Sequence, residues 1–136
     1  SNASAAQINF RFNNSAVGSI SSTSSSTAFN TSSDYRLKEN VVGISDGITR
    51  LKTLKPSRFN FKVDKDTTVD GFLAHEVTPV VPEAITGTKD EVDENNEPVY
   101  QGIDQSKLVP LLTAALQEAI AKIEILETKV AALEAG

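Results

Sequence analysis

The stretch VPLLTAALQEAIAKIEILETKVAALEAG, Val109 to Gly136, carries the most regular pattern in the chain. Its apolar residues recur at the a and d places of an unbroken heptad, which are Val109, Leu112, Leu116, Ala119, Ile123, Leu126, Val130 and Leu133. This repeat predicts a long helix whose apolar stripe packs against another helix. The alternative is an ordinary amphipathic helix lying on its own domain, because Ala115 and Ile120 widen the stripe in its first half.

Charged residues beside the stripe indicate how such helices would associate. Lys122 and Lys129 fall at g positions, and Glu127 and Glu134 fall at the e positions that follow them. This arrangement pairs g of one strand with e of a neighbour in parallel register. Branched residues at a with leucine at d favour two strands, whereas apolar residues at e and g favour more. The heptads therefore predict parallel self-association and leave the number of strands open.

Composition excludes several classes of protein. The 136 residues have room for one modest domain with appendages. Lys and Arg number 13 against 18 Asp and Glu, and no basic stretch interleaves with aromatic residues, so we expect no nucleic-acid partner. One His and no Cys argue against a zinc site, a thiol nucleophile or a disulfide framework. No apolar run is long enough to span a membrane, and we expect no metal and no cofactor.

The N-terminal part divides into a tag and a polar segment. Residues 1–3 resemble the remnant of a cleaved expression tag. Residues 4–32 are rich in Ser and Thr, with Ile8, Phe10 and Phe12 alternating with polar neighbours. This pattern predicts a short strand followed by a polar, weakly structured run. The segment is either a flexible linker or the end of a stalk that becomes ordered only against copies of itself.

Helix and hairpin signals follow in the middle of the chain. Ser45 can cap a helix that carries apolar residues at helical spacing and ends before Pro56. The segments 57–63 and 69–77 then predict a hairpin, with the charged turn DKDT of residues 64–67 between them.

Two short segments complete the region before the long helix. TPVVPEAI, residues 78–85, predicts a helical turn bounded by prolines, and residues 87–103 predict an acidic loop or second hairpin. The carboxylates of that loop lack the D-x-D-x-D-G spacing of a calcium loop, so we interpret them as a solvated face.

A serine and a lysine stand five residues apart in SSDYRLKEN, residues 32–40. A serine hydroxyl becomes a good nucleophile only beside a base, and a lysine is a base only once its ammonium has lost a proton. On one continuous helix Ser33 and Lys38 would lie about 140° apart and could not meet. They can meet if Ser33 lies on an extended or turn segment and a helix begins after it with Asp34 as N-cap. The alternative is a capping Ser-Asp pair and a surface lysine.

Four blocks of sequence resemble one known family. They are SDYRLKENV (33–41), LKTLKPSRFNFK (51–62), GFLAHEVTPVVPEAI (71–85) and YQGIDQSKLVPLLTAALQEAI (100–120), followed by the coiled coil. In this order they resemble the intramolecular chaperone domain of phage tailspikes and tail fibres, the S74 peptidase family. The resemblance covers residues 33–136 and implies a domain that trimerises, aligns the upstream fibre for folding and cuts itself off before a serine that matches Ser33.

The resemblance also implies roles for individual residues. The scissile bond would join Ser32 to Ser33, with Ser33 as nucleophile and Lys38 as base. Asp34 and Arg36 match the rest of the family motif and would orient the turn, the base and the developing oxyanion. His75 and Glu76 would be supporting neighbours of the site, and the alternative for His75 is a hydrogen-bonded histidine of the hairpin.

The expected architecture is α+β: a small hairpin-containing domain with a long C-terminal helix, which forms a parallel trimeric coiled coil, preceded by a β-rich stalk segment. The expected domains are the stalk end at 4–32 and the chaperone domain at 33–136, with its coiled coil at 106–135. We expect a homotrimer that acts on the upstream stalk of its own chain. Its location would be a virion tail fibre, or the precursor of one in the host cytoplasm. A non-cleaving trimerisation cap of a fibre or adhesin is the alternative function.

Overall fold

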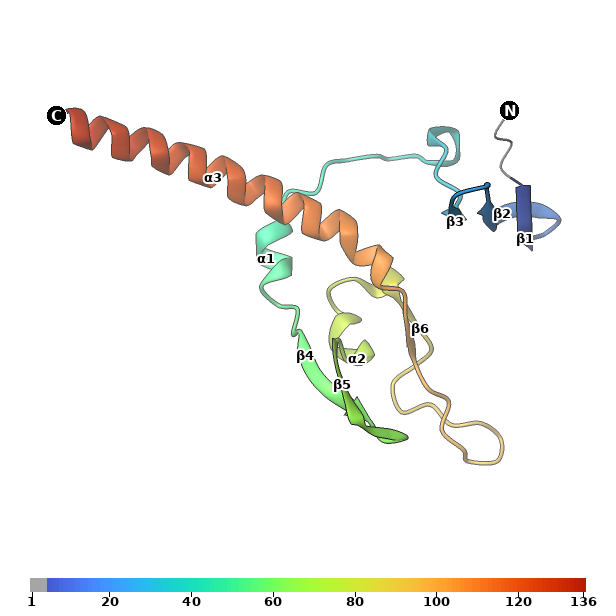
Figure 1. The fold of residues 1–136 in the computed structure, drawn as a ribbon. Coiled ribbons are helices and arrows are strands. Elements are labelled where there is room, and N and C mark those ends of the chain that lie inside the picture. Colours follow the sequence, from blue (N-terminus) through green and yellow to red (C-terminus); the bar gives the residue numbers. More distant parts are fainter. Residues whose placement is uncertain (1–4) are drawn as a thin grey trace. The chain divides into compact units, whose positions relative to one another are not determined.

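The computed structural model describes residues 5–136, so the predicted tag remnant at residues 1–3 lies outside the described residues. The chain forms two compact units, one ending at Val42 and one beginning at Gly43 (Figure 1). Each unit has its own secondary structure, and each is described by itself below.

The first unit is built on an antiparallel sheet of three strands in the order β1-β2-β3. These strands are β1 (Ala5–Phe12), β2 (Ser15–Ser22) and β3 (Thr27–Thr31). Asn13 and Asn14 link the first two strands with φ angles of 46° and 64°, the conformation that a two-residue hairpin loop requires and that asparagine tolerates. The predicted weakly structured run is therefore wrong. Polar residues form strands here because the ladder pairs backbone groups, whatever the side chains are.

The faces of this sheet differ in polarity. Ile8 lies opposite Ile20, and Ile20 lies opposite Phe29, so these three apolar side chains share one face. Ile8 and Phe29 are exposed and Ile20 is half-buried. On neighbouring pairs the Asn30 amide donates to the hydroxyls of Ser19 and Ser21 at 3.3 and 3.0 Å. One chain by itself thus leaves an apolar row open to solvent.

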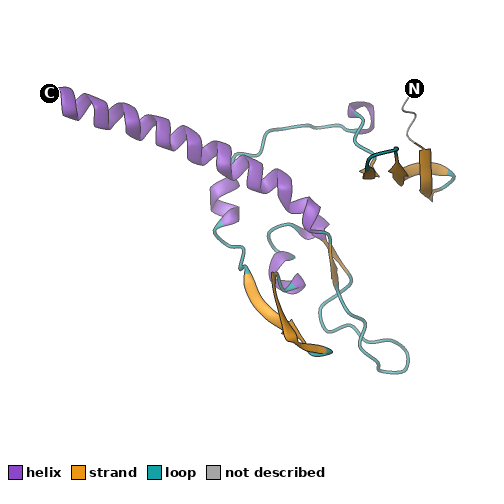
Figure 2. Cartoon of the chain, in the orientation of Figure 1, coloured by secondary structure: helices purple, strands orange, loops and turns teal. Residues whose placement is uncertain are grey.

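The second unit combines short strands with helices and ends in one long helix (Figure 2). In chain order its elements are α1 (Gly47–Leu51), β4 (Ser57–Phe61), β5 (Asp64–Gly71), α2 (Ala74–Val77), the 3-10 turn η2 (Pro82–Ala84), β6 (Ile85–Thr86), β7 (Gly102–Ile103), the 3-10 turn η3 (Gln105–Leu108) and α3 (Val109–Ala135). β4 pairs with β5 and β6 pairs with β7, both antiparallel. The α+β class expected from the sequence is confirmed.

The core of the second unit lies where the start of α3 meets the segments around α1, α2 and η2. Its buried side chains are Leu54, Val77, Val80, Val81, Ala84, Leu108 and Leu111. Close packing of α1 on α3 adds to it. A Cβ on Gly47 would lie 2.6 Å from the backbone nitrogen of Ala115, so only glycine lets the two helices approach this closely.

Three local predictions in this unit are wrong. Asp46, rather than Ser45, stands at the N-cap of α1. The β4–β5 turn is Lys62–Val63, and the DKDT segment lies in β5. The predicted second strand ends at Gly71, and His75 lies in α2 rather than in a hairpin. The physical reason for the last difference is burial, because a helical turn after Leu73 carries Val77 into the core, where it is 1% exposed.

The acidic segment before β7 forms the predicted loop. Val92 and Pro98 form an isolated antiparallel bridge across it. The Asp93 carboxylate accepts hydrogen bonds from the backbone N–H groups of Asn95 and Glu97 at 2.8 and 2.9 Å. The Glu97 bond, then the Asn95 bond, hold the pKa of Asp93 below its ordinary value. This carboxylate thus closes a turn.

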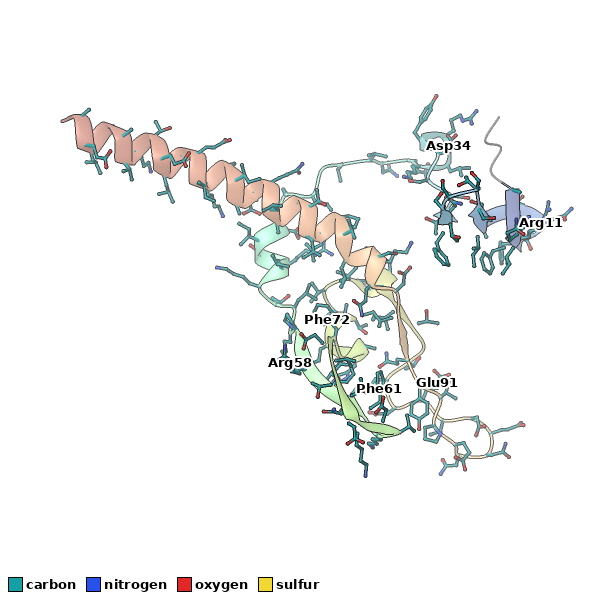
Figure 3. All side chains as sticks on the ribbon, in the orientation of Figure 1. Arg11, Asp34, Arg58, Phe61, Phe72 and Glu91 are labelled. Carbon is teal, nitrogen blue, oxygen red and sulfur yellow. The ribbon has the colours of Figure 1, made fainter. Side chains whose placement is uncertain are left out.

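Helix α3 packs on its own unit with one face and leaves the heptad stripe uncovered. Leu111 and Ala115, which lie outside the a and d positions, are its buried residues. Every heptad residue named above is exposed except Ala119, which is half-buried. All residues from Ala121 to the end of the chain are exposed, and their side chains stand clear of the rest of the second unit in Figure 3.

Candidate functional site

A single turn brings Ser33 and Lys38 together in the first unit. Asp34 has extended backbone (φ −64°, ψ 136°), residues Tyr35–Leu37 form a 3-10 turn (η1), and Lys38 is extended again. The backbone N–H of Lys38 donates to the carbonyl of Tyr35 at 3.1 Å, which closes the turn. As a result the Lys38 Nζ donates to the Ser33 Oγ at 2.7 Å. Ser33 precedes this turn and lies outside any helix or strand, which is the arrangement that the two side chains require to meet.

Asp34 caps the turn and binds Arg36 at the same time. Its Oδ1 accepts from the backbone N–H of Arg36 and from Nε of Arg36, both at 2.9 Å. Its Oδ2 accepts from Nη2 of Arg36 at 2.7 Å. The Arg36 side chain, then its backbone N–H, hold the pKa of Asp34 below the ordinary value, and Lys38 adds an attraction. Asp34, labelled in Figure 3, is therefore a charged cap that stiffens the turn.

The residue before the dyad is attached to the sheet. The backbone N–H of Ser32 donates to the carbonyl of Val17 at 3.1 Å, which extends the β2–β3 ladder by one bond beyond Thr31. The peptide bond between Ser32 and Ser33 therefore joins the end of the sheet to the start of the capped turn.

This cluster is open to solvent within one chain. Ser33, Asp34, Arg36 and Lys38 are all exposed. Lysines that serve as bases owe their lowered pKa to burial or to neighbouring positive charge. The geometry can thus pass a proton between Ser33 and Lys38, while efficient base catalysis requires a drier setting.

His75 and Glu76 belong to the second unit, in α2. The Glu76 Oε1 accepts from Nζ of Lys55 at 3.0 Å, and Glu76 is half-buried. His75 is exposed and lines a hollow with aromatic side chains of the hairpin and of the segment before β7, among them Phe59, Phe61 and Tyr100. The structure thus gathers four of the predicted site residues in one cluster and places these two in another.

Two residues that lie near these clusters were not predicted from the sequence. Val17 contributes only its carbonyl to Ser32, and a backbone contact leaves no signature in the side chain. Lys55 pairs with Glu76, which lies far from it in the sequence. The opposite charges of Lys55 and Glu76 are the only sequence signal for this pair. The chain has 13 Lys and Arg and 18 Asp and Glu, so charge by itself does not select one partner.

The described residues offer neither a cluster of metal ligands nor a membrane-spanning helix. Within residues 5–136, no group of three or more His, Cys, Asp or Glu side chains is placed to hold a metal ion. None of the helices in that range has the length and apolar character needed to cross a membrane.

Comparison with known proteins identifies part of the chain. Residues 33–86 match the family model Peptidase_S74, described as chaperone of endosialidase. The match begins at Ser33 and extends through the hairpin, α2 and η2 to the end of β6. No curated protein matches the chain. The inferred resemblance is confirmed over residues 33–86, which contain the first three of the four sequence blocks.

Proposed function

Because the chain carries a chaperone-of-endosialidase domain of the peptidase S74 family over residues 33–86, we propose that it is a C-terminal intramolecular chaperone of a phage tail fibre or tailspike. It trimerises, aids the folding of the stalk upstream, and releases itself by cutting the bond between Ser32 and Ser33. The observation that carries the cleavage is the 2.7 Å hydrogen bond between Lys38 Nζ and Ser33 Oγ, at the first residue of the family match. The cleavage takes place on a virion tail fibre or on its precursor in the host cytoplasm.

The reaction uses groups that the turn already brings together. Once Lys38 has lost a proton, its amine accepts the hydroxyl proton of Ser33 across the same hydrogen bond. The Ser33 oxygen bonds to the carbonyl carbon of Ser32, the bond from that carbon to the nitrogen of Ser33 breaks, and the proton passes to this nitrogen. Water then hydrolyses the ester, leaving a carboxylate on Ser32 and a free hydroxyl and amine on Ser33.

Asp34 and Arg36 hold the turn in which the dyad forms. Their paired hydrogen bonds keep Ser33 before the turn and Lys38 after it, so both act as positioning residues. His75 and Glu76 are proposed as supporting residues, with Glu76 held by Lys55. Since the family resemblance includes members with Gln at the position of His75, we expect His75→Gln to retain cleavage.

Trimerisation is supported by the heptad stripe of α3. Apart from the half-buried Ala119, its residues are exposed, although the helix buries Leu111 and Ala115 on its own unit. An apolar stripe of this length is unfavourable in water and becomes buried when parallel helices associate. The number three is taken from the family resemblance.

The deciding experiment is mass spectrometry of the chain attached to its natural stalk, followed over days under conditions where it is trimeric. We expect a fragment of residues 33–136, formed faster as the pH rises, since the base must lose a proton. Ser33→Ala and Lys38→Ala should each abolish the fragment without changing the assembly. Ser32→Ala is the matched control and should be cut, because its hydroxyl has no role. Dilution should not slow cleavage while the trimer persists.

The second candidate is a non-cleaving trimerisation cap of a fibre or adhesin. The solvent exposure of Ser33 and Lys38 in one chain favours it. Under this alternative the trimeric protein stays whole at every pH, and Ser33→Ala behaves as the unaltered chain does.

A further inference from the structure

We infer that strand β2 positions the scissile bond for attack by Ser33. The carbonyl of Val17 holds the acyl side of that bond, and Gly18, which has no side chain, lets β3 pair closely with β2 beside it. This inference rests on the proposed self-cleavage and adds to it two positioning residues at some distance in the sequence from the dyad. All of the contacts that carry it lie within the first unit.

The first observation is where the ladder ends. β2 and β3 pair up to Gly18 and Thr31, and the bond from Ser32 N–H to the Val17 carbonyl continues the pairing by one residue. The last residue held by the sheet is therefore Ser32, whose carbonyl is the group to be attacked. Ser33 is the first residue beyond the sheet.

The second observation is that the two sides of the bond are held by different parts of the unit. The sheet holds Ser32, whereas the Asp34 cap and the hydrogen bond to Lys38 hold Ser33. Nucleophile and carbonyl belong to adjacent residues, so only the torsions between them decide whether the oxygen faces the carbon. Fixing both sides restricts those torsions and favours a near-attack arrangement, with the reacting atoms about 3–3.5 Å apart.

The third observation is the close approach at Gly18. A Cβ there would lie 2.7 Å from the carbonyl oxygen of Asn30. That oxygen is part of the backbone of β3 and cannot rotate away as a side chain could. Any larger residue at position 18 must therefore move β3 away from β2. The strands would separate at Asn30, which is two residues before Ser32. Glycine at this position allows the close pairing that fixes the carbonyl.

The chemical step gains no new reactant from this arrangement. The bonds that form and break are those given above, and water remains the second substrate. The sheet affects the first step, the transfer of the acyl group from nitrogen to the Ser33 oxygen, because that step depends on the torsions at the bond. It has no part in the proton transfer to Lys38 or in ester hydrolysis.

The test compares cleavage rates of the full trimeric chain and four variants. Gly18→Ala separates the strands, and its control Gly43→Ala adds the same methyl group where no atom lies within 4 Å. Ser32→Pro removes the N–H that bonds Val17, and its control Ser32→Ala keeps this N–H. Intact mass spectrometry follows the fragment that begins at Ser33. Circular dichroism and sedimentation test whether each variant folds and assembles as the unaltered chain does.

Gly18→Ala and Ser32→Pro should each slow cleavage roughly tenfold or more, since small misplacements of reacting groups can cost up to about a hundredfold in rate. Gly43→Ala should cleave at the rate of the unaltered chain, and Ser32→Ala should cleave clearly faster than Ser32→Pro. The midpoint of the pH profile should not move, because the groups that exchange protons are unchanged. Hydroxylamine, which cuts esters, should not restore the slow variants, because their ester forms slowly in the first place.

Each other result overturns the inference. If the unaltered chain cleaves and both variants match it, β2 has no positioning role while the proposed function stands. If the unaltered chain never cleaves, the inference falls together with the proposed function. A shifted pH midpoint or rescue by hydroxylamine would place the effect on a different step. Should Gly18→Ala fail to fold, the comparison of Ser32→Pro with Ser32→Ala decides by itself.

Discussion

The carboxylate of Glu118 in α3 accepts a hydrogen bond from the backbone N–H of Ile48 in α1 at 3.0 Å. The N–H groups of the first turn of a helix have no partner within the helix, so this carboxylate satisfies one of them from outside. Lys122, one turn further along α3, donates to the other oxygen of Glu118 at 2.9 Å. Together with the contact of Gly47 on Ala115, this bond fixes where the short helix sits on the long one.

Stability of the second unit should depend on the ionisation of Glu118. The bond from Ile48, then the bond from Lys122, hold its pKa below the ordinary value of 4.5. The stabilisation is therefore complete above that ordinary value and is lost as the pH falls through the lowered value. Glu118→Gln should flatten the acid part of the stability curve, measured by denaturant unfolding between neutral and acid pH.

Glu124→Gln is the control for that measurement, because Glu124 is exposed on the same helix. Its curve should follow the curve of the unaltered chain. Equal flattening in both variants would show that the Ile48 bond does not contribute to the acid dependence.

Enlarging Gly47 should separate α1 from α3. Gly47→Ala places a methyl carbon 2.6 Å from the backbone nitrogen of Ala115. A backbone atom cannot rotate away as a side chain can, so one of the two helices must shift. We expect a loss of about 1–3 kcal/mol in the free energy of unfolding. Gly102→Ala adds a methyl group that meets no atom within 4 Å and should change stability by less than about 0.5 kcal/mol. Similar losses in the two variants would contradict the close approach.

Two adjacent residues of α3 can show whether assembly depends on the heptad position of an exposed apolar side chain or only on its exposure. Leu126 is 58% exposed at a d position, and Ile125 is 55% exposed at a c position. Leu126→Lys should weaken assembly strongly, since each chain loses the burial of one leucine, about 1.5–3 kcal/mol. Ile125→Lys should leave assembly unchanged. Light scattering should return three times the chain mass of 14.5 kDa for the Ile125 variant and smaller species for the Leu126 variant. Equal assembly of the two would refute the heptad interface.

The apolar row of the β1–β3 sheet should be protected only in the assembled protein. Ile8 and Phe29 are exposed in one chain and share a face with Ile20, so association is needed to cover them. Chymotrypsin should therefore cut at Phe29 faster in the Leu126→Lys variant than in the Ile125→Lys variant, as peptide mapping would show. Equal protection would mean that the sheet is stable by itself.

Asp34→Asn should slow self-cleavage without removing either member of the dyad. The amide can still accept one bond from the Arg36 N–H, but it loses the charged pair with the guanidinium. Arg36→Lys should have a smaller effect, because a lysine can retain the charge but not the double hydrogen bond. The measurement is the rate at which the fragment beginning at Ser33 appears. Rates equal to that of the unaltered chain would leave the capped turn without a role in positioning.

The sequence by itself determined the features that depend on neighbouring residues. Asp34 caps the turn and Lys38 reaches Ser33 because a few backbone torsions within one segment bring them together. The length of α3 and its heptad stripe follow in the same way from a repeat within one helix. The sequence pattern also predicted the pairing of β4 with β5, although it misplaced the turn by a few residues.

Only the tertiary structure decided which distant groups meet. Leu111 and Ala115, rather than the heptad residues, became the buried face of α3, because Gly47 offers α1 a place to approach there. A helical turn replaced the predicted strand around His75, since Val77 had to reach the core. The carbonyl of Val17 came to hold Ser32 through the register of two polar strands. Backbone groups are alike at every residue, so a contact between them appears only when the chain has folded.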